Sequence, residues 1–362
     1  TNVTSSSANI KLQGTNVSLS GTNTVTTNGT VSILPMDSAN SFNAALTVAS
    51  GFNLGSGVTG FTVGKTSNTA SVTLGSAINI AGPVTVYGGS IAANANITAT
   101  GGNILLDADT GTTLSQSTHG IELAAGVVLK TLTSGDITLL GRSGNGACAS
   151  PACRGIYAAS AATINAAGNV SLTGLSFTSG SSGRGIDLFG VGISAGGYIS
   201  MTGQHAPANA TYAVALGAYG STQSTLTSGN GIRLEALNNT IGTIALDGST
   251  SLNGGSGDIV LTGAVLDLRS SAKTFTTSGK ITIQPDADES SFGSSLNTQY
   301  LSFSANNTGI TIGKPGNTAA VTIGTNVVSS GPVTVYGGDI TLANNLTSSS
   351  AGAAIKLLAM GS

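Results

Sequence analysis

The stretch that decides the fold is Gly82-Pro83-Val84-Thr85-Val86-Tyr87-Gly88-Gly89, because the same eight residues return as Gly331 to Gly338, 249 positions later. The shared register reaches well beyond these residues, since Ile10 matches Ile259 and Asn96 matches Asn345 at the same offset. A fixed period of this kind indicates an array of stacked units. We therefore expect one long repeat of about 249 residues (1–249) followed by the start of a second (250–362).

Within the motif, apolar β-branched residues alternate with small polar ones, which is typical of a half-buried strand. Similar short segments recur along the chain and are often bracketed by Gly, Asn or Asp, residues that suit tight bends (137–139, 170–172, 199–201, 259–261 and 281–283). No window keeps a helical period, so we expect almost no helix. The pattern predicts an all-β protein, a parallel β-helix of roughly 16 short coils forming one continuous shaft over 1–362.

Charge is scarce in this chain, with 12 Lys+Arg, 14 Asp+Glu and a net charge of −2. So weak a charge gives no reason to expect a nucleic-acid partner. No apolar run is long enough to span a membrane as a helix. The charged residues and the two histidines, His119 and His205, lie too far apart in sequence to suggest a catalytic cluster, a cofactor site or a metal site. We therefore expect each histidine to be solvated.

Two segments break the rhythm and are expected to leave the coil as loop excursions, 141–155 and 204–228, with 286–297 as a smaller third. The first holds both cysteines, Cys148 and Cys153. In an exported protein these two would form a disulfide that closes the loop. Free thiols remain an alternative, as does a metal site, which would need two further ligands.

Other candidate residues have both a functional and a structural interpretation. Calcium binding is conceivable at Asp107 and Asp109, or at Asp286, Asp288 and Glu289, although corner residues or an exposed acidic loop explain these acids better. Lys65 and Lys314 occupy the same place in the two copies. They are interpreted either as contacts to another rod or to a ligand, or as solvated corner residues whose stems lie along the shaft. Tyr87 and Tyr336 are likewise either packing residues or exposed contacts for sugars.

Both ends of the sequence fall inside the repeat. Thr1 opens in mid-pattern without a basic region or an apolar core, and the residues near Lys356 correspond to those near Leu105. We therefore expect the chain to be part of a longer protein.

Four segments carry a family likeness: Gly-Asp-Ile-Thr-Leu at 135–139 and 338–342, Gly-Asn-Val-Ser-Leu-Thr-Gly at 168–174, and Gly-Asp-Ile-Val-Leu-Thr-Gly at 257–263. They resemble the shaft repeats of filamentous-haemagglutinin-like exoproteins of Gram-negative bacteria. The resemblance implies a right-handed β-helix, an extracellular or cell-surface location, export through an outer-membrane partner, and a role in adhesion, biofilm or filament formation.

These observations together predict a non-enzymatic structural shaft that joins further copies of itself end to end or laterally. The alternative is a binding module whose loops or Thr/Asn-rich face bind a glycan, a host receptor or ice. A polysaccharide-degrading enzyme would require three or more charged side chains to converge in a cleft.

Overall fold

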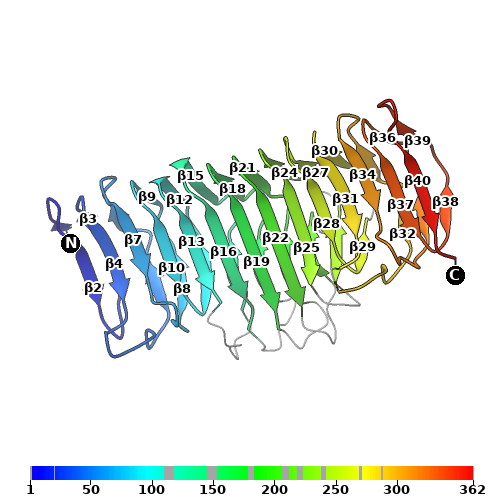
Figure 1. Ribbon diagram of the computed structural model, residues 1–362. Helices are drawn as coiled ribbons and strands as arrows, with labels where there is room; N and C mark the ends of the chain where they lie inside the picture. Colours follow the sequence, from blue (N-terminus) through cyan, green and yellow to red (C-terminus); the bar gives the residue numbers. More distant parts are fainter. Residues whose placement is uncertain are drawn as a thin grey trace.

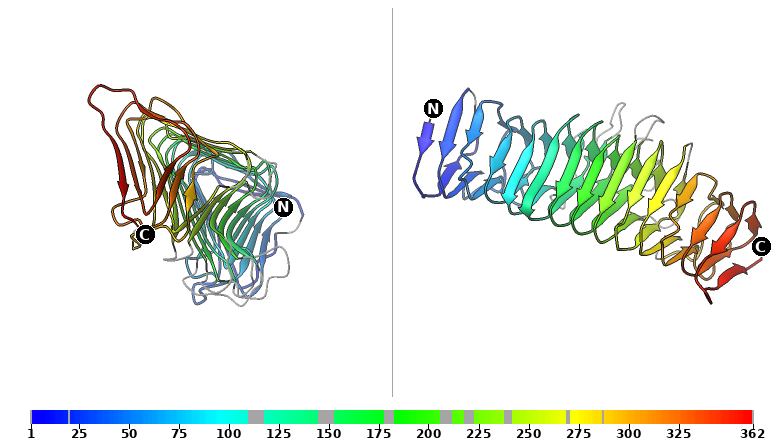
Figure 2. Two further views of the ribbon diagram at one scale, coloured as in Figure 1. Left: turned by 90° about the vertical axis from the view of Figure 1, so that its right-hand side faces the viewer. Right: turned by 90° about the horizontal axis from the view of Figure 1, so that it is seen from above.

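The computed structural model describes residues 2–19, 21–109, 118–144, 153–177, 183–205, 212–217, 223–237, 242–268, 271–286 and 288–361. Every regular element in these segments is a short strand. Every strand pair within them is parallel. The chain winds in a right-handed sense into a rod with a roughly triangular cross-section (Figures 1 and 2). The predicted right-handed parallel β-helix is therefore confirmed. None of the described segments contains an apolar helix of membrane-spanning length.

One sheet, here called the long sheet, runs the whole length of the rod (Figure 1). Its fourteen strands are β2 (Ile10–Gln13), β4 (Thr30–Leu34), β7 (Gly60–Val63), β10 (Val84–Tyr87), β13 (Ile104–Ala108), β16 (Ile137–Arg142), β19 (Val170–Ser176), β22 (Ile199–His205), β25 (Ile232–Leu237), β28 (Ile259–Thr262), β31 (Lys280–Gln284), β34 (Gly309–Ile312), β37 (Val333–Gly337) and β40 (Ile355–Ala359). The sequence predicts roughly 16 coils of about 22 residues each, and the fourteen strands are close to that number. The coils in the middle of the rod are somewhat longer.

A second sheet forms another side of the rod. It holds β5 (Leu46–Val48), β8 (Ser71–Leu74), β11 (Ser90–Ala93), β14 (Ile121–Leu123), β17 (Arg154–Ala158), β20 (Arg184–Leu188), β23 (Tyr212–Leu216), β26 (Thr243–Leu246) and β29 (Val265–Asp267). A shorter sheet of β32 (Leu296–Asn297), β35 (Val321–Ile323) and β38 (Ile340–Leu342) follows it in the last coils.

A third sheet completes the coil. It holds β9 (Ile78–Ile80), β12 (Ile97–Gly101), β15 (Val128–Ser134), β18 (Thr163–Ala166), β21 (Gly192–Ala195), β24 (Ser224–Ser228), β27 (Thr250–Asn253), β30 (Lys273–Thr276) and β33 (Leu301–Phe303). Two short sheets adjoin its ends, β1 (Asn2–Thr4), β3 (Asn23–Thr26) and β6 (Phe52–Leu54) at one, and β36 (Val327–Ser329) and β39 (Leu346–Ser348) at the other.

Side chains alternate between the two faces of each strand. The inward ones give the tube a mostly aliphatic interior, which also holds buried phenylalanines such as Phe52, Phe61 and Phe275. In β19, Val170 and Leu172 are about 1% exposed, while Ser171 between them is only partly covered. Polar ladders link the coils on the outside. Asn103 Oδ1 accepts a hydrogen bond from Asp136 N, and Asp136 Oδ1 accepts one from Asn169 N, at 2.9 and 2.7 Å. Such ladders satisfy corner backbone groups one coil at a time.

Matching segments of the two repeat copies occupy matching places. Val84 pairs with Phe61 and Ile104, and Val333 pairs with Ile310 and Ile355. Their turns also carry the same bonds. Asn68 Nδ2 donates to Tyr87 O and Asn317 Nδ2 to Tyr336 O, each at 2.8 Å. The repeat seen in the sequence is thus a repeat of contacts as well as of residues.

Much of the predicted 204–228 excursion lies in the coil. Its residues include β23 and β24, which pair with their neighbours in the second and third sheets. Of the 141–155 excursion, Arg142 ends β16 and Arg154 begins β17. The segments 145–152, 206–211 and 218–222 lie outside the described residues. The smaller 286–297 segment ends in the two-residue strand β32.

Candidate functional site

The corner between the long sheet and the second sheet differs from the other corners in the middle coils. Here β16, β19 and β22 extend to six or seven residues. The two sheets touch at Gly155, where a β-carbon would lie 2.3 Å from Leu175 N and 2.7 Å from the Gly174 carbonyl carbon, both on the long sheet. No side chain fits at so close an approach, so only glycine can occupy this position. The residues beyond this contact form a small second layer outside the tube.

Polar side chains are buried in this second layer. Ser176 and His205 are register partners at the ends of β19 and β22, and they are 2% and 1% exposed. Ser176 Oγ donates to Cys153 O at 3.2 Å, which ties the long sheet to the segment before β17. His205 was expected to be solvated, and this expectation is wrong because the extended strand carries the ring into the layer.

Three charged side chains converge beside this layer on the second sheet. Arg154 and Arg184 are register partners on β17 and β20, and both pair with Asp187 Oδ2. The Arg184 Nη1 to Asp187 Oδ2 distance is 2.9 Å. The two arginines are 6% exposed and the aspartate 2%. A charge buried this deeply is tolerated only when its partners are close, so the three residues depend on one another.

Aromatic rings flank the two arginines. The Arg154 guanidinium lies 4.4 Å from the centre of the Tyr157 ring, and that of Arg184 lies 5.2 Å from the Tyr212 ring. Both separations are within the range of cation–π attraction. The Tyr212 hydroxyl continues the network by donating to Asp267 Oδ2 at 3.2 Å, two strands further along the sheet.

His119 borders the same cluster. Its Nδ1 accepts a hydrogen bond from Arg154 N at 3.2 Å, and its ring centre lies 5.0 Å from that of Tyr157. Burial, together with the positive charge of Arg154, lowers the pKa of His119 from 6.5 to about 4. The imidazole is therefore neutral at pH 7, with its Nδ1 lone pair engaged by the backbone.

The chemistry open to this cluster follows from its charges. Asp187 is the counter-ion of two arginines, and its Oδ2 is engaged by both of them. His119 is neutral near pH 7, so it is not a general acid there, and its Nδ1 lone pair is already engaged by the Arg154 backbone N–H. No group of three or more His, Cys, Asp or Glu side chains in the described part of the chain could hold a metal ion. The arrangement therefore serves best as an internal brace for the corner.

The acidic residues considered for calcium have other contacts. Asp109 forms an ion pair with Arg142, and Asp107 Oδ1 accepts the Asp109 backbone N–H at 2.9 Å. Burial, added to by the neighbouring Asp109 charge, raises the pKa of Asp107. Asp286 is 3% exposed, and its backbone carbonyl accepts a bond from Lys314 Nζ at 2.6 Å. These contacts agree with the interpretation of corner residues.

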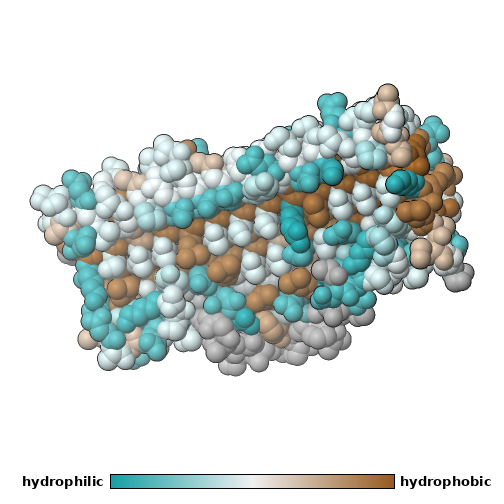
Figure 3. Space-filling view, in the orientation of Figure 1, coloured by the Kyte–Doolittle hydropathy of each residue, from teal (hydrophilic) through white to brown (hydrophobic). Residues whose placement is uncertain are grey.

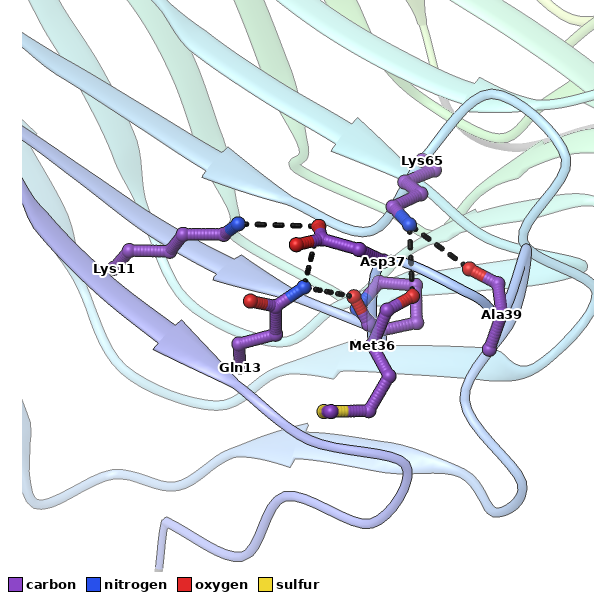
Figure 4. Close-up of polar contacts among 7 residues, drawn as sticks. Lys11, Gln13, Met36, Asp37, Ala39 and Lys65 are labelled. Atoms are coloured by element: carbon purple, nitrogen blue, oxygen red, sulfur yellow. Dashed lines mark hydrogen bonds and ion pairs between the residues drawn. The ribbon is translucent and has the colours of Figure 1, made fainter.

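Lys65 is a clamp between coils rather than a free cation (Figure 4). Its Nζ donates to Met36 O and Ala39 O, both at 2.9 Å, on the loop that follows β4. Beside it, Asp37 pairs with Lys11 at 3.2 Å and accepts a bond from Gln13 Nε2 at 2.6 Å. Lys314 holds the matching loop of the second copy, so both lysines have structural partners.

The remaining candidates are distributed along the rod. Tyr87 and Tyr336 are half-buried on the outer face of the long sheet. Cys153 is 2% exposed just before β17. Cys148 lies outside the described residues, so the disulfide between them stays a prediction.

The charged cluster is the feature that the sequence analysis missed, although a signal for it exists. Arg154-Gly155-Ile156 and Arg184-Gly185-Ile186 repeat one tripeptide, and Tyr157 and Asp187 follow at the next position. Aligning these tripeptides places the two arginines in one row and the aspartate beside them. The spacing of 30 residues, longer than the assumed coil, concealed the match.

Comparison with known proteins adds no identification. No known protein family matches the chain, and no curated protein sequence does.

Proposed function

We propose that this chain is a non-enzymatic structural shaft of a large secreted or cell-surface bacterial adhesin or extracellular filament. The observation that carries the proposal is the long sheet, whose fourteen parallel strands continue without interruption from β2 to β40. A tube stabilised by contacts between neighbouring coils is suited to holding two points apart. In the described coils its interior is filled by buried apolar side chains.

The location and the partners belong to the same proposal. The family likeness of the repeats supports a member of the filamentous-haemagglutinin-like group that is exported through an outer-membrane partner and acts outside the cell. Further copies of the repeat are the natural neighbours of such a rod, because a coil left unpaired exposes strand backbone.

The surface gives little support to an ice-binding role, because hydrophobic residues are mixed with polar ones over the face that carries the long sheet (Figure 3). The outward row of the long sheet includes Thr85, Thr138 and Thr311, but Leu105, Arg233 and Val260 interrupt it. A flat hydroxyl array would need the same side chain on successive coils. This observation favours the shaft over an ice-binding module.

Electron microscopy of the native material in culture fluid tests the proposal. One repeat, from β2 to β28, spans nine strand spacings in the long sheet. At about 4.8 Å each, the axial repeat should be about 43 Å. Straight rods with that repeat would support a shaft. Globular particles, or a protein confined to the cytoplasm, would contradict it.

A further inference from the structure

A small hollow lies on the long sheet where its edge meets the preceding corner. It has a volume of about 380 Å³ and is lined by Tyr198, Asn230, Gly231, Arg233, Asp258 and Val260 with their neighbours. This volume lies in the range of small-molecule sites. All of these residues lie in the described part of the rod, away from the charged cluster.

The hollow exists because a glycine interrupts a row of side chains. The register places Gly231 between Tyr198 on the preceding coil and Asp258 on the following one. Gly231 has φ +130°, and a β-carbon there would lie 2.7 Å from Asp258 O. A larger residue is excluded, so the floor of the hollow is backbone and its two walls are one coil apart on either side.

The first wall is an unusually exposed aromatic ring. Tyr198 is 59% exposed, whereas Tyr300, the other strongly exposed tyrosine described, is 37% exposed and has Lys273 Nζ 5.6 Å from its ring centre. A tyrosine exposes both an apolar face and a hydroxyl, a combination enriched where proteins bind partners. Leaving the ring in water gains nothing for the stability of the rod.

The opposite wall, formed by Asp258, and the coil of Gly231 between the two walls carry polar groups that are held in place. Asp258 Oδ1 accepts the Lys280 backbone N–H at 2.7 Å, which fixes the carboxylate. The Asn230 backbone N–H is bound by Ser228 Oγ at 3.2 Å. Arg233 forms an ion pair with Glu235 at 2.9 Å, so its charge is balanced on the same face. The hollow thus combines an aromatic face with a carboxylate and an amide, and Asp258 leaves it with one uncompensated negative charge.

We propose that this hollow, here called the Tyr198 notch, binds a neutral oligosaccharide. A sugar ring has an apolar face that can lie on Tyr198 and hydroxyl groups that can bond to Asp258 and Asn230, which offer acceptors and donors. An anionic sugar would be repelled by Asp258, because the charge of Arg233 is already paired with Glu235. The notch adds a binding function to the shaft and does not depend on the shaft's length or location.

Titration with cellotetraose and with chitotetraose, followed by saturation-transfer NMR, tests this proposal. A single shallow site predicts a dissociation constant near 1 mM, on the order of −4 kcal/mol. Tyr198→Ala should weaken binding at least tenfold, and Asp258→Ala severalfold. Tyr336→Ala is the matched control, because it removes a half-buried tyrosine elsewhere on the same sheet and should leave binding unchanged.

Several results would overturn the proposal. The first is that neither sugar binds at a concentration 10-fold above the expected dissociation constant. The second is that binding survives Tyr198→Ala at full strength. A third is a change in sedimentation: if Tyr198→Ala separates associated rods into single ones, the notch is a contact between copies of this chain. Circular dichroism of each variant checks that the fold is intact, so a loss of binding is not mistaken for unfolding.

Discussion

Replacing Asn68 by alanine should loosen three successive coils at once. The side chain is fully buried in the turn after β7. Its Oδ1 accepts bonds from Ser41 Oγ at 2.9 Å and Phe42 N at 3.3 Å, both on the preceding coil. Its Nδ2 donates to Tyr87 O at 2.8 Å on the following coil. One amide group thus joins coils that contain different parts of the sequence.

The size of the effect follows from what alanine leaves behind. Each hydrogen bond contributes about 1 kcal/mol net, and a buried group left without a partner costs about 1–3 kcal/mol. Phe42 N and Tyr87 O would both lose the Asn68 contact in a buried setting. We expect the local free energy of opening to fall by about 4 kcal/mol, which corresponds to a loss of amide protection of about 10³-fold.

Hydrogen exchange followed by mass spectrometry is the appropriate assay, because a stacked array need not unfold in one step. Peptides covering 41–48 and 84–87 should lose protection, while those beyond β25 should not change. Asn317→Ala should have a similar effect in the second copy, since its bonds to Ser291, Phe292 and Tyr336 measure 2.9, 3.1 and 2.8 Å.

Asn53→Ala is the control, because this exposed side chain bonds only to Gly51 O, two residues away, among the contacts seen. It should change protection by less than about 0.5 kcal/mol. If Asn68→Ala behaves like Asn53→Ala, the buried amide does not join the coils and the reasoning is refuted.

Three further predictions concern the corner. Asp187→Ala should lower the free energy of unfolding by about 3–5 kcal/mol, because it leaves two arginines buried without their shared counter-ion. Arg233→Ala, at an exposed ion pair, should lower it by less than about 1 kcal/mol. Equal effects of the two variants in urea denaturation would argue against the brace. Folding lowers the pKa of His119 to about 4, so the unfolded chain binds more protons than the folded one as the pH falls from 6.5 towards 4. The free energy of opening the corner should therefore fall by up to about 3 kcal/mol over that window and stay constant above it. Hydrogen exchange of β14 and β17 at pH 7 and pH 5 measures this change, and a His119→Gln variant with the same pH dependence would contradict it. Gly155→Ala should cost about 3 kcal/mol through backbone overlap, against about 1 kcal/mol for Gly126→Ala, which has open space around it; thermal melts that rank them in the opposite order would disprove the close approach.

The tube itself could be predicted from the sequence because its information is local and repeated. Alternation in segments such as 84–87 sets which side chains face inward, and the bends at Gly and Asn set where each strand ends. The matching of Lys65 with Lys314 and of Tyr87 with Tyr336 also came from the sequence alone. These are properties of one strand or of one offset, and they need no knowledge of which coil lies beside which.

The charged cluster could not be read in the same way because it depends on register. Arg154, Arg184 and Asp187 come together only when coils of 30 residues stack, and a uniform short coil would place them apart. For the same reason His205 looked solvated, since nothing local indicates that β22 continues past the corner. Long coils with unequal corners therefore conceal the contacts that a regular period would predict.

The stacking of coils is the central claim, and a distance between two spin labels tests it most directly. Thr62 and Thr311 lie on the outer face of β7 and β34, nine strands apart in the long sheet. The two native cysteines are replaced by serine, and spin labels are attached at these two positions. The stacked tube predicts a narrow distribution of label-to-label distances centred at about 43 Å. A broad distribution, or one centred below about 30 Å, would contradict a single continuous rod.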